Sequence, residues 1–338
     1  MAETVLVTGA SGFIATHCIL ALLEKGYAVR GTVRDPARGG ALKAALAKAN
    51  PAAANLALVA ADLNSDAGWA EAVAGCRYVL HIASPNPLTQ PRDKDAFVAA
   101  ARGGALRVLK AAKAAGVARV VLTSSIAAVG YGRSRPQGRA LTELDWTDPD
   151  AGDVTAYPRS KTLAERAAWD YVDGEGKGLE LSVVNPALVL GPALETDYGS
   201  SAELVYQILA KKIPGYPRVG FTIVDVRDVA ALHLSCMTDP AAAGQRFIAA
   251  KEFMWIEDVG KILREAYPKR ALPKMRVPNW AVYAMALVNP PAKLVIPELG
   301  RRRDLSHDKA MKLLGWKPRT AKESILATAE SMIALGIV

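Results

Sequence analysis

The chain has 338 residues, 51% of them hydrophobic and 22% charged, which is enough for one large domain or two closely packed ones with a sizeable core. Its net charge is +9, but no basic block with interleaved aromatic residues is present, so the composition argues against nucleic acid as a partner. The three cysteines and four histidines are scattered, which argues against a disulfide framework and a metal site. Because no apolar run has membrane-spanning length and no leader-like segment precedes the first strand, we expect no membrane contact and a cytoplasmic location. The one dense basic cluster, residues 301–303, is interpreted as a solvated turn or a subunit contact.

The first stretch of the chain predicts a buried strand, a tight turn and a helix. Thr4–Val7 is an apolar run, and apolar residues recur at helical spacing from Phe13 until Gly26. Gly9 and Gly12 lie between strand and helix, where they let a ligand approach the backbone. The unpaired N–H groups of the helix N-terminus favour a pyrophosphate. The turn therefore predicts a dinucleotide site, although an ordinary strand-turn-helix has the same pattern.

Strands and helices then alternate along the chain. We expect strands at residues 27–33, 56–60, 78–82 and 119–123, and helices at 41–49, 69–73 and 95–115. Such alternation predicts an α/β fold with a doubly wound parallel sheet, in which ligands bind beyond the carboxyl ends of the strands. Further helices are expected near residues 202–212, 255–267 and 277–288.

The residues after the second strand predict the choice of cofactor. An acid at this point would accept hydrogen bonds from the ribose hydroxyls of NAD. The sequence instead has Arg34, whose guanidinium suits a 2′-phosphate, and Arg38 and Lys43 would add positive charge. Asp35 is either an acid displaced by one position or a restraint on Arg34. The pattern favours NADP(H) over NAD.

Two further strand ends carry small or polar residues. Asp62 would accept a hydrogen bond from an adenine amino group, although a capping aspartate is equally natural there. Ala83 and Ser84 would let a nucleotide lie against the backbone, although a turn before Pro85 explains them as well.

The residue pattern that predicts a catalytic site comes later in the chain. Tyr157 and Lys161 are four residues apart, so on a helix they lie on one face. Pro158 requires that the helix has just begun, with Thr155 or Asp153 as its cap. A tyrosine and a lysine at this spacing also occur on solvated helix faces. The preceding glycine turn and the serine pair at the end of the fifth strand favour a catalytic role.

The expected chemistry is proton donation to a carbonyl group. The ammonium of Lys161, the helix N-terminus and a nearby oxidised nicotinamide would lower the pKa of Tyr157. Its phenol would then protonate a carbonyl oxygen as hydride reaches the carbon, while Ser125 donates to the same oxygen.

Several segments together resemble an extended short-chain dehydrogenase/reductase. They are Thr8-Gly-Ala-Ser11-Gly12-Phe13-Ile14-Ala15, Thr123-Ser124-Ser125, Tyr157-x-x-x-Lys161, the run from Asn185 to Pro192, and the run from Val224 to Ala230. Residues 33–36 and 160–169 narrow the resemblance to the branch of dihydroflavonol reductases, cinnamoyl-CoA reductases and bacterial aldehyde or ketone reductases. The motifs cover about the first 240 residues in the order of the family.

The resemblance implies an NADP(H)-binding Rossmann domain at residues 1–185, to which residues 222–250 return. It also implies a smaller, mostly helical substrate domain at 186–221 and 251–338. Ser125, Tyr157 and Lys161 are the implied catalytic set. The implied cofactor contacts are Thr8, Gly9, Ser11, Gly12, Phe13, Ile14, Arg34, Lys43, Asp62, Leu63, Ala83, Ser84, Thr123, Tyr157, Lys161, Pro186, Leu188 and Val189.

Two departures from the family pattern bear on the ligands. Ala15 replaces the third glycine but is still small. Gly130 stands where flavonoid-reducing relatives have a substrate-orienting asparagine, which argues against a polyphenolic substrate.

We expect the loops 85–91, 130–150 and 193–221 to surround the site. The aromatic candidates for its wall are Tyr131, Tyr198, Tyr206, Tyr216 and Phe221.

The resulting hypothesis is an NADPH-dependent reductase of aldehydes or ketones, with a neutral, hydrophobic or aromatic carbonyl (or alcohol) substrate, acting as a monomer or homodimer. An NAD-dependent nucleotide-sugar epimerase or hydroxysteroid-type dehydrogenase is the alternative enzyme, and Arg34 argues against it. A non-catalytic dinucleotide-sensing regulator is a third hypothesis. Such proteins usually lose the catalytic tyrosine, whereas Tyr157 and Lys161 are both present here.

Overall fold

The computed structural model describes residues 2–85, 93–132, 138–196, 198–288 and 296–338. Its central element is a parallel sheet of seven strands in the order β10-β6-β5-β4-β1-β2-β3. The strands are β1 Thr4–Val7, β2 Ala28–Val33, β3 Ala57–Ala60, β4 Tyr78–His81, β5 Arg119–Thr123, β6 Glu180–Pro186 and β10 Arg246–Ala249. The expected doubly wound parallel sheet is confirmed.

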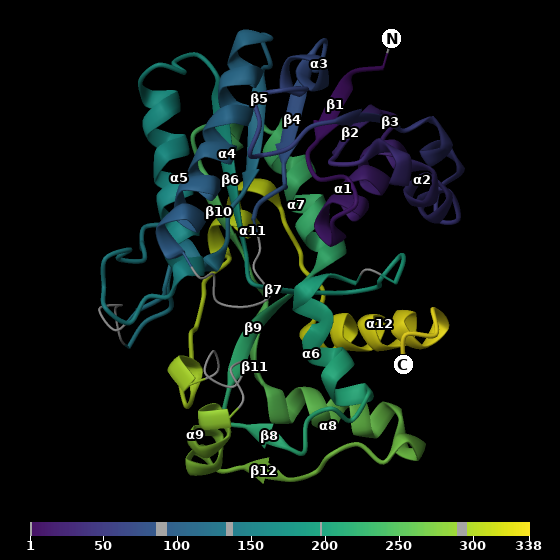
Figure 1. Ribbon diagram of the computed structural model, residues 1–338, viewed down its shortest axis with the longest axis vertical. Helices are drawn as coiled ribbons and strands as arrows, with labels where there is room; N and C mark the ends of the chain where they lie inside the picture. The colour runs from purple at the N-terminus through teal and green to yellow at the C-terminus, as the bar shows by residue number, and fades with distance from the viewer. Residues whose placement is uncertain (1, 86–92, 133–137, 197, 289–295) are drawn as a thin grey trace.

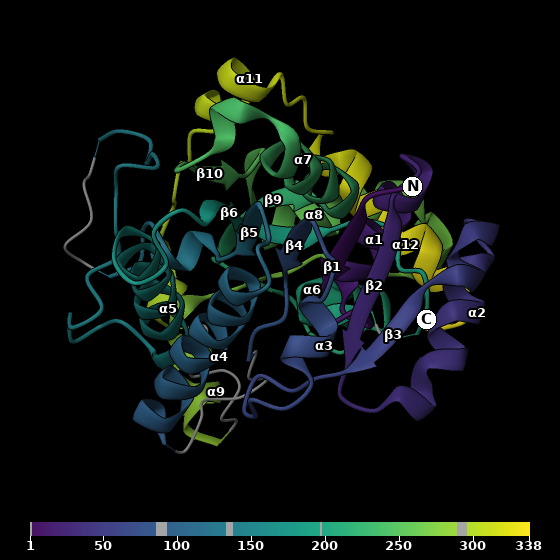
Figure 2. The same cartoon turned by 90° about the horizontal axis from the view of Figure 1, so that it is seen from above.

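Helices cover both faces of this sheet (Figures 1 and 2). One face carries α1 Phe13–Glu24, α2 Gly39–Ala47 and α7 Val226–Thr238, and the other carries α3 Trp69–Val73, α4 Lys94–Ala114 and α5 Ala156–Asp173. The chain reverses its direction of winding between β1 and β4, because β2 and β3 lie on one side of β1 and the later strands on the other. In doubly wound sheets this switch point is where a ligand crevice opens.

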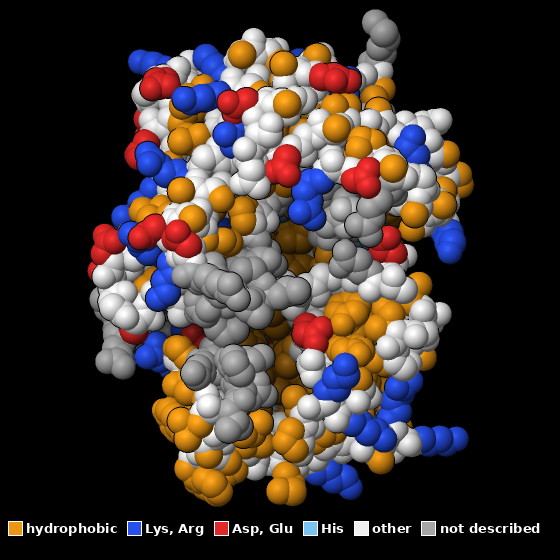
Figure 3. Space-filling view, viewed as in Figure 1, with side chains coloured by type: hydrophobic (Ala, Val, Ile, Leu, Met, Phe, Trp, Pro, Cys, Tyr) orange, Lys and Arg blue, Asp and Glu red, His pale blue; other side chains and the backbone are white. Residues whose placement is uncertain are grey.

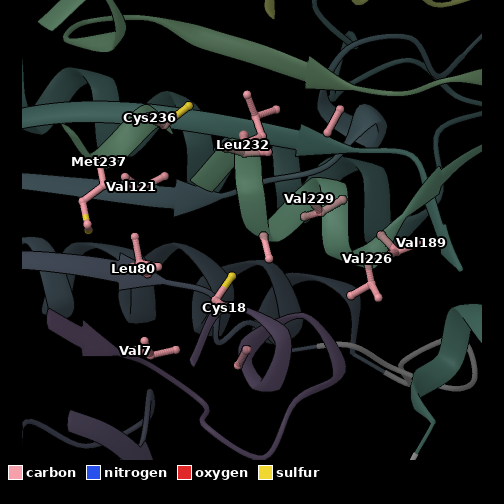
Figure 4. Packing of buried hydrophobic residues seen from close by; sticks show 14 of the residues in the cluster. Val7, Cys18, Leu80, Val121, Val189, Val226, Val229, Leu232, Cys236 and Met237 are labelled. Carbon is pink, nitrogen blue, oxygen red and sulfur yellow. The ribbon is translucent and has the colours of Figure 1, made fainter. Parts of the chain in front are cut away.

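The core between the sheet and α7 is close-packed and apolar. Figure 4 shows Val7, Leu80 and Val121, from three neighbouring strands, facing Val229 and Leu232 of α7. Branched side chains fit a sheet that is buried on both faces, and this explains why its strands are nearly continuous apolar runs.

A second, smaller part of the molecule lies below the carboxyl ends of the large sheet (Figure 1). Its three-stranded sheet consists of β7 Leu188–Leu190, β9 Gly220–Asp225 and β11 Glu252–Trp255, and its two-stranded sheet of β8 Tyr216–Pro217 and β12 Arg276–Val277. The surrounding helices are α6 Gly199–Leu209, α8 Ile256–Ala266, α9 Asn279–Val288 and α12 Ala321–Ala334, while α11 Asp308–Leu314 packs beside β10. Short 3₁₀ turns lie at Pro36–Arg38, Pro51–Asn55, Ile126–Ala128, Pro240–Ala242, Pro268–Arg270 and Ile296–Glu298.

Very short segments connect the two parts. Ala187 alone separates β6 of the large sheet from β7 of the small one, and its N–H donates to the carbonyl of Ala249 at 2.9 Å. β9 ends at Asp225 and α7 begins at Val226, the next residue. Only residues 250–251 separate β10 from β11. These three crossings therefore join regular elements of the two parts almost directly, whereas the crossings before and after α11, at residues 299–307 and 315–320, are longer.

The expected elements are found with shifts of at most three residues at their ends, and the strands at 4–7 and 119–123 and the helix at 69–73 match without a shift. The helix expected at 202–212, for example, is α6 at Gly199–Leu209. The strands after β5 were not predicted from the sequence, although five of them form the smaller sheets in the lower half of the molecule. Parts of the expected site loops, residues 86–91 and 133–137, lie outside the described residues. Among the described helices, none combines the length and apolar character needed to cross a membrane.

Three buried histidines make the fold sensitive to acid. The pKa values of His17, His81 and His233 are lowered to about 4, 3 and 4, mainly by burial. The Nδ1–H of His233 donates to the Val229 carbonyl at 2.8 Å, and its Nε2 lies 2.7 Å from the hydroxyl of Thr123. Each ring is thus held neutral in the folded chain, and below about pH 6.5 it gains a proton when the chain unfolds.

We expect the free energy of unfolding to fall as the pH drops below about 6.5, because the unfolded state then binds more protons than the folded state. As the pH falls, each of the three histidines lowers the free energy of unfolding by roughly 1.4 kcal/mol per pH unit, until the pH reaches the pKa of that histidine in the folded chain. Urea unfolding midpoints measured between neutral pH and about pH 4.5 test this expectation. A midpoint that stays constant over that range would contradict it.

Candidate active site

The glycine turn after β1 forms a cradle for a ligand. Gly9 has φ +67°, and a Cβ there would lie 3.0 Å from the Cβ of Ala83, so a larger residue would be strained in its backbone and tightly packed against Ala83. Helix α1 begins directly after Gly12, and no side chain caps its N-terminus. Its first N–H groups are therefore available to an anion, as a dinucleotide pyrophosphate requires.

A cavity of about 470 Å³ extends from this turn along the carboxyl ends of the strands, between the two parts of the molecule. Figure 3 shows the hollow, with hydrophobic side chains in its depth. The residues that line it and that the sequence predicted are Gly12, Phe13, Ile14, Ser84, Thr123, Ser125, Tyr131, Tyr157, Lys161, Pro186, Leu188, Val189 and Phe221. The three predicted catalytic side chains thus lie in one cavity with eight further predicted cofactor contacts.

Tyr157 and Lys161 occupy the first two turns of α5. The helix begins at Ala156 with Thr155 as N-cap residue, and the cap position makes no side-chain hydrogen bond. Tyr157 therefore lies in the first turn, as expected. Its phenol hydrogen-bonds to the side chain of Ser125, and the ammonium of Lys161 lies 3.5 Å from the carbonyl oxygen of Thr123. Strand β5 and helix α5 thus bring the three side chains together.

The direction expected for the pKa of Tyr157 is wrong for the ligand-free protein. Burial raises the pKa of this phenol, and the hydrogen bond from Ser125 only partly opposes the effect. Burial also lowers the pKa of Lys161 to about 8, against the opposing charge of Glu165. The sequence predicted the neighbouring charge, but it does not show how completely the folded chain removes water from both groups. At neutral pH the phenol is therefore protonated and Lys161 is largely an ammonium.

A buried network ties the glycine turn to β4 beside Lys161. The Thr8 hydroxyl accepts hydrogen bonds from the backbone N–H groups of Ile82 and Ala83, both at 3.0 Å. Its own proton can then be donated to Nδ1 of His81, which lies at 2.9 Å. The charge of Lys161 contributes to the low pKa of His81. Thr8 and Ala83 therefore shape the floor beneath the turn rather than the wall of the cavity.

The predicted phosphate-recognition residues lie at the end of β2. Arg34 is exposed and directly follows the strand, and Lys43 is half-buried on α2. Asp35 caps the short turn that follows, because its carboxylate accepts from the N–H of Ala37 at 2.9 Å. This contact explains Asp35 as the capping residue of the turn. The position of Arg34 is then set by the strand that it follows. The side chain of Arg38 lies outside the described part of the chain.

The remaining predicted cofactor contacts follow β3 and the glycine turn. Asp62 accepts from the backbone N–H of Asn64 at 2.8 Å, so it is a turn-forming aspartate with a further oxygen for a ligand. Leu63 packs against Gly104 of α4. Ser11 is exposed in the turn before α1. None of these three residues lines the 470 Å³ cavity, which is confined to the half of the crevice near Tyr157.

The aromatic wall differs in part from the expectation. Tyr131 and Phe221 line the cavity. Tyr216 is fully buried in the lower core and donates to the Pro273 carbonyl at 2.8 Å, so it is a packing residue. Tyr198 and Tyr206 pack against each other, with ring centroids 5.6 Å apart, and Tyr198 donates to Glu203.

Sequence reasoning missed several residues of the cavity wall. They are Ile82, Ile126 and Thr222. Ser124 and Ala187 belong to motifs singled out in the sequence, and Pro85 and residues 199–201 lie within the expected loops 85–91 and 193–221. Thr222 comes from β9, two residues before the motif that begins at Val224. The packing of β9 between β7 and β11 brings it to the site.

The basic cluster at residues 301–303 has three different environments. Arg303 is buried, pairs with Glu298 and lies over the ring of Tyr131 at 4.0 Å, so the interpretation as a solvated turn is wrong for this residue. Arg302 is the exposed member and pairs with Asp304 at 2.9 Å. Arg301 borders a second cavity of about 190 Å³, which also touches Tyr131 and Tyr157.

Comparisons with known proteins agree with this geometry. The model of the NAD-dependent epimerase/dehydratase family matches residues 5–250. Cinnamoyl-CoA reductase 1 of Petunia hybrida is 38% identical over 275 residues, covering 80% of this chain and 79% of that protein. Tetraketide alpha-pyrone reductase 1 of Arabidopsis thaliana is 36% identical over 278 residues, covering 80% and 83%.

Solved structures share the fold over nearly the whole chain. Gre2 of Candida albicans, solved in complex with NADPH, superposes with a TM-score of 0.81 at 28% identity, covering 98% of this chain and 99% of that one. The yeast methylglyoxal/isovaleraldehyde reductase Gre2, also complexed with NADPH, gives a TM-score of 0.79 at 28% identity, covering 99% and 100%.

Proposed function

Because the chain belongs to the NAD-dependent epimerase/dehydratase family, in the branch of extended short-chain dehydrogenase/reductases that contains cinnamoyl-CoA reductases, we propose that it is an NADPH-dependent carbonyl reductase. It reduces an aldehyde or ketone to the alcohol, with Tyr157 as proton donor. The observation that carries the proposal is the convergence of Tyr157, Ser125 and Lys161 in one cavity that begins at the glycine turn.

The residues at the sheet edge fit NADP(H). Gly9 and Gly12 leave room for the backbone to approach a pyrophosphate, and the uncapped N-terminus of α1 supplies N–H donors. The guanidinium of Arg34, exposed directly after β2, would form bidentate, charge-assisted hydrogen bonds with a 2′-phosphate. The complexes of both Gre2 proteins with NADPH support the same assignment. When bound, the cofactor supplies the hydride.

At the reacting carbonyl, the residues of this chain donate one proton and stabilise one developing negative charge. Tyr157 holds its proton at neutral pH, because burial raises its pKa, and it donates that proton to the carbonyl oxygen. The Ser125 hydroxyl, already hydrogen-bonded to the phenol, donates to the same oxygen as negative charge develops. The ammonium of Lys161 stabilises the tyrosinate that remains.

The cavity wall favours a neutral, hydrophobic or aromatic substrate. Phe13, Ile82, Tyr131, Leu188 and Phe221 contribute much of its surface. In the described part of the wall, Lys161 is the only basic side chain, and we assign it to Tyr157. A substrate carboxylate would thus have no dedicated partner there.

The environment of Gly130 supports the exclusion of polyphenols. A Cβ at this position would lie 2.1 Å from Cδ1 of Leu141, and the carbonyl of Gly130 accepts from Arg303 at 3.1 Å. A substrate-orienting asparagine would not fit without displacing Leu141.

We also propose the division into a cofactor domain at 1–185 with 222–250, and a substrate domain at 186–221 with 251–338. The seven-stranded sheet and its helices account for most of the first, and the smaller sheets with α6, α8, α9 and α12 account for most of the second. Both contribute to the 470 Å³ cavity.

The proposal is tested by following the oxidation of reduced nicotinamide with purified protein and a panel of aliphatic, aromatic and α-keto carbonyl compounds. We expect turnover with NADPH preferred over NADH. Arg34→Ala should raise the KM for NADPH by roughly 10- to 100-fold, because a charge-assisted contact of about 1.5–3 kcal/mol is lost, and should leave the KM for NADH almost unchanged.

Lys48→Ala is the matched control, because Lys48 is an exposed cation that follows α2 in the same segment. It should alter neither KM value. A wild-type protein that prefers NADH tenfold or more would overturn the role of Arg34. A lack of turnover with every carbonyl and both cofactors would overturn the proposed activity.

A further inference from the structure

A buried ion pair lies behind the candidate catalytic residues. Glu165 is on α5, one helical turn beyond Lys161, and Arg246 is on β10 at the edge of the large sheet. The Nε of Arg246 lies 2.8 Å from Oε1 of Glu165, and the two side chains are 7% and 0% exposed. Burying two charges is costly, and an apolar pair of similar volume is often as stable. Fold stability alone therefore gives little reason for an ion pair at this position.

The carboxylate of Glu165 is connected to the strand end that carries Ser125. Its Oε2 accepts from the Ser124 hydroxyl at 2.5 Å and from Nδ2 of Asn185 at 2.8 Å. The same Nδ2 of Asn185 also donates to the backbone carbonyl of Ser125 at 3.1 Å. One carboxylate thus links the end of β5, the end of β6 and helix α5.

The guanidinium of Arg246 is itself held from several sides. It lies 3.7 Å from the ring centroid of Trp146 and donates to the backbone carbonyls of Glu143 and Asp145 at 3.2 and 3.0 Å. A second contact to Glu165 Oε2 measures 3.3 Å. Arg246 therefore has little freedom, and it fixes the orientation of the Glu165 carboxylate.

We propose that Glu165 is a positioning residue for the carbonyl reduction, which holds Ser125 at its donating position through Ser124 and Asn185 and keeps a negative charge beside Lys161. This inference rests on the proposed function and adds a role for Glu165 and Arg246, which are not among the residues that line the 470 Å³ cavity. The ion pair with Arg246 is the anchor of this arrangement. Its first consequence is geometric: the Ser125 hydroxyl must stay aligned with the phenol of Tyr157 while a substrate enters.

The second consequence concerns the charge of Lys161. The titratable groups that interact with its ammonium are Glu165 on α5 and His81 on β4, while Arg246 on β10 faces Glu165. Tyr157 lies one helical turn before Lys161 on α5. Burial lowers the pKa of Lys161 to about 8, and Glu165 acts in the opposite direction. Removal of that carboxylate lowers the pKa of Lys161 further, so the ammonium is lost at a lower pH.

The variant Glu165→Gln removes the charge and keeps the shape of the side chain. We expect kcat to fall by roughly 10- to 100-fold, because small displacements of a catalytic group have effects of this size. The KM for NADPH should be almost unchanged, and the alkaline limb of the pH profile of kcat/KM should move to lower pH. An NMR titration of the Lys161 side chain, which needs no turnover, should show the same shift in ligand-free protein.

A second variant separates this role from a loss of folding. Glu165→Gln leaves Arg246 as an unpaired buried cation, whereas Glu165→Gln/Arg246→Met removes both charges and should restore stability but not kcat. Arg119→Met is the matched control: Arg119 is a buried arginine of the same sheet, paired with Glu180 at 2.6 Å, at the end of β5 remote from Ser125. It should lower the urea midpoint and leave kcat and the pH profile unchanged.

The outcomes distinguish the two proposals. If wild-type protein reduces carbonyl compounds but Glu165→Gln has the same kcat and the same Lys161 titration, the positioning role is overturned and the activity stands. If Arg119→Met changes the pH profile equally, the effect is one of general stability and the positioning role is again overturned. If wild-type protein reduces no carbonyl compound, the proposed activity falls, and the Lys161 titration alone decides whether Glu165 acts on this residue.

Discussion

Tyr157→Phe is expected to reduce kcat for carbonyl reduction by roughly 10²–10⁴-fold, the range that general acid catalysis contributes. The substitution removes one hydroxyl from a buried ring and leaves the ring to fill the same space. Ser125 would still donate to the carbonyl oxygen, but the proton that the product alcohol requires would have to come from water. We expect the affinity for NADPH, measured by fluorescence titration, to change little.

Tyr171→Phe is the control for this prediction. Tyr171 lies on the same helix, packs against the core on the α4 and α5 face of the sheet, and does not line the cavity. Its loss of a hydroxyl should leave kcat unchanged. If Tyr157→Phe retained more than a tenth of the wild-type kcat, the phenol would not be the proton donor.

The second large effect is expected for Lys161→Met, with a reduction of kcat by roughly 10- to 10³-fold. An opposite charge within about 4–6 Å shifts a pKa by about 1–3 units, and this is the stabilisation that the tyrosinate of Tyr157 would lose. In wild-type protein, kcat/KM should fall as the pH rises through about 8, because Lys161 is an ammonium below its pKa and neutral above it. This alkaline limb should be absent in Lys161→Met.

Protein stability separates this effect from misfolding. The folded pKa of Lys161, about 8, is below its ordinary value of 10.5, so below pH 8 the folded chain retains a costly buried charge. Methionine removes that cost, and the urea midpoint of Lys161→Met at neutral pH should equal or exceed that of wild type. Lys110→Met, at an exposed position on α4, is the control and should alter neither property. Full activity in Lys161→Met would refute the assigned role.

Local patterns predicted much of the fold and the central part of the site. Thr4–Val7 and the helix after Gly12 follow from periodicity and glycine placement over about 20 neighbouring residues. The spacing of Tyr157 and Lys161 likewise needs only one helical turn. These features depend on residues close in sequence, so a single chain contains the information.

Features that depend on distant contacts could not be predicted in this way. Arg246 pairs with Glu165 across 81 positions of sequence, and no local pattern links β10 to α5. The direction of the pKa of Tyr157 was wrong because burial, a property of the assembled fold, raises this pKa and outweighs the hydrogen bond from Ser125. The run 301–303 consists of three arginines, which look alike in the sequence, yet tertiary packing buries Arg303 and exposes Arg302.

The near-direct connection of the two sheets restricts how the molecule responds to a ligand. A hinge needs residues whose backbone angles are free to change, and Ala187 is buried, hydrogen-bonded to Ala249 and enclosed between two strands. Val226 follows Asp225 without any intervening linker. The base of the crevice should therefore behave as one stiff body. We expect the outer walls of the cavity, such as α6 with Ser201, to move when substrates of different size bind.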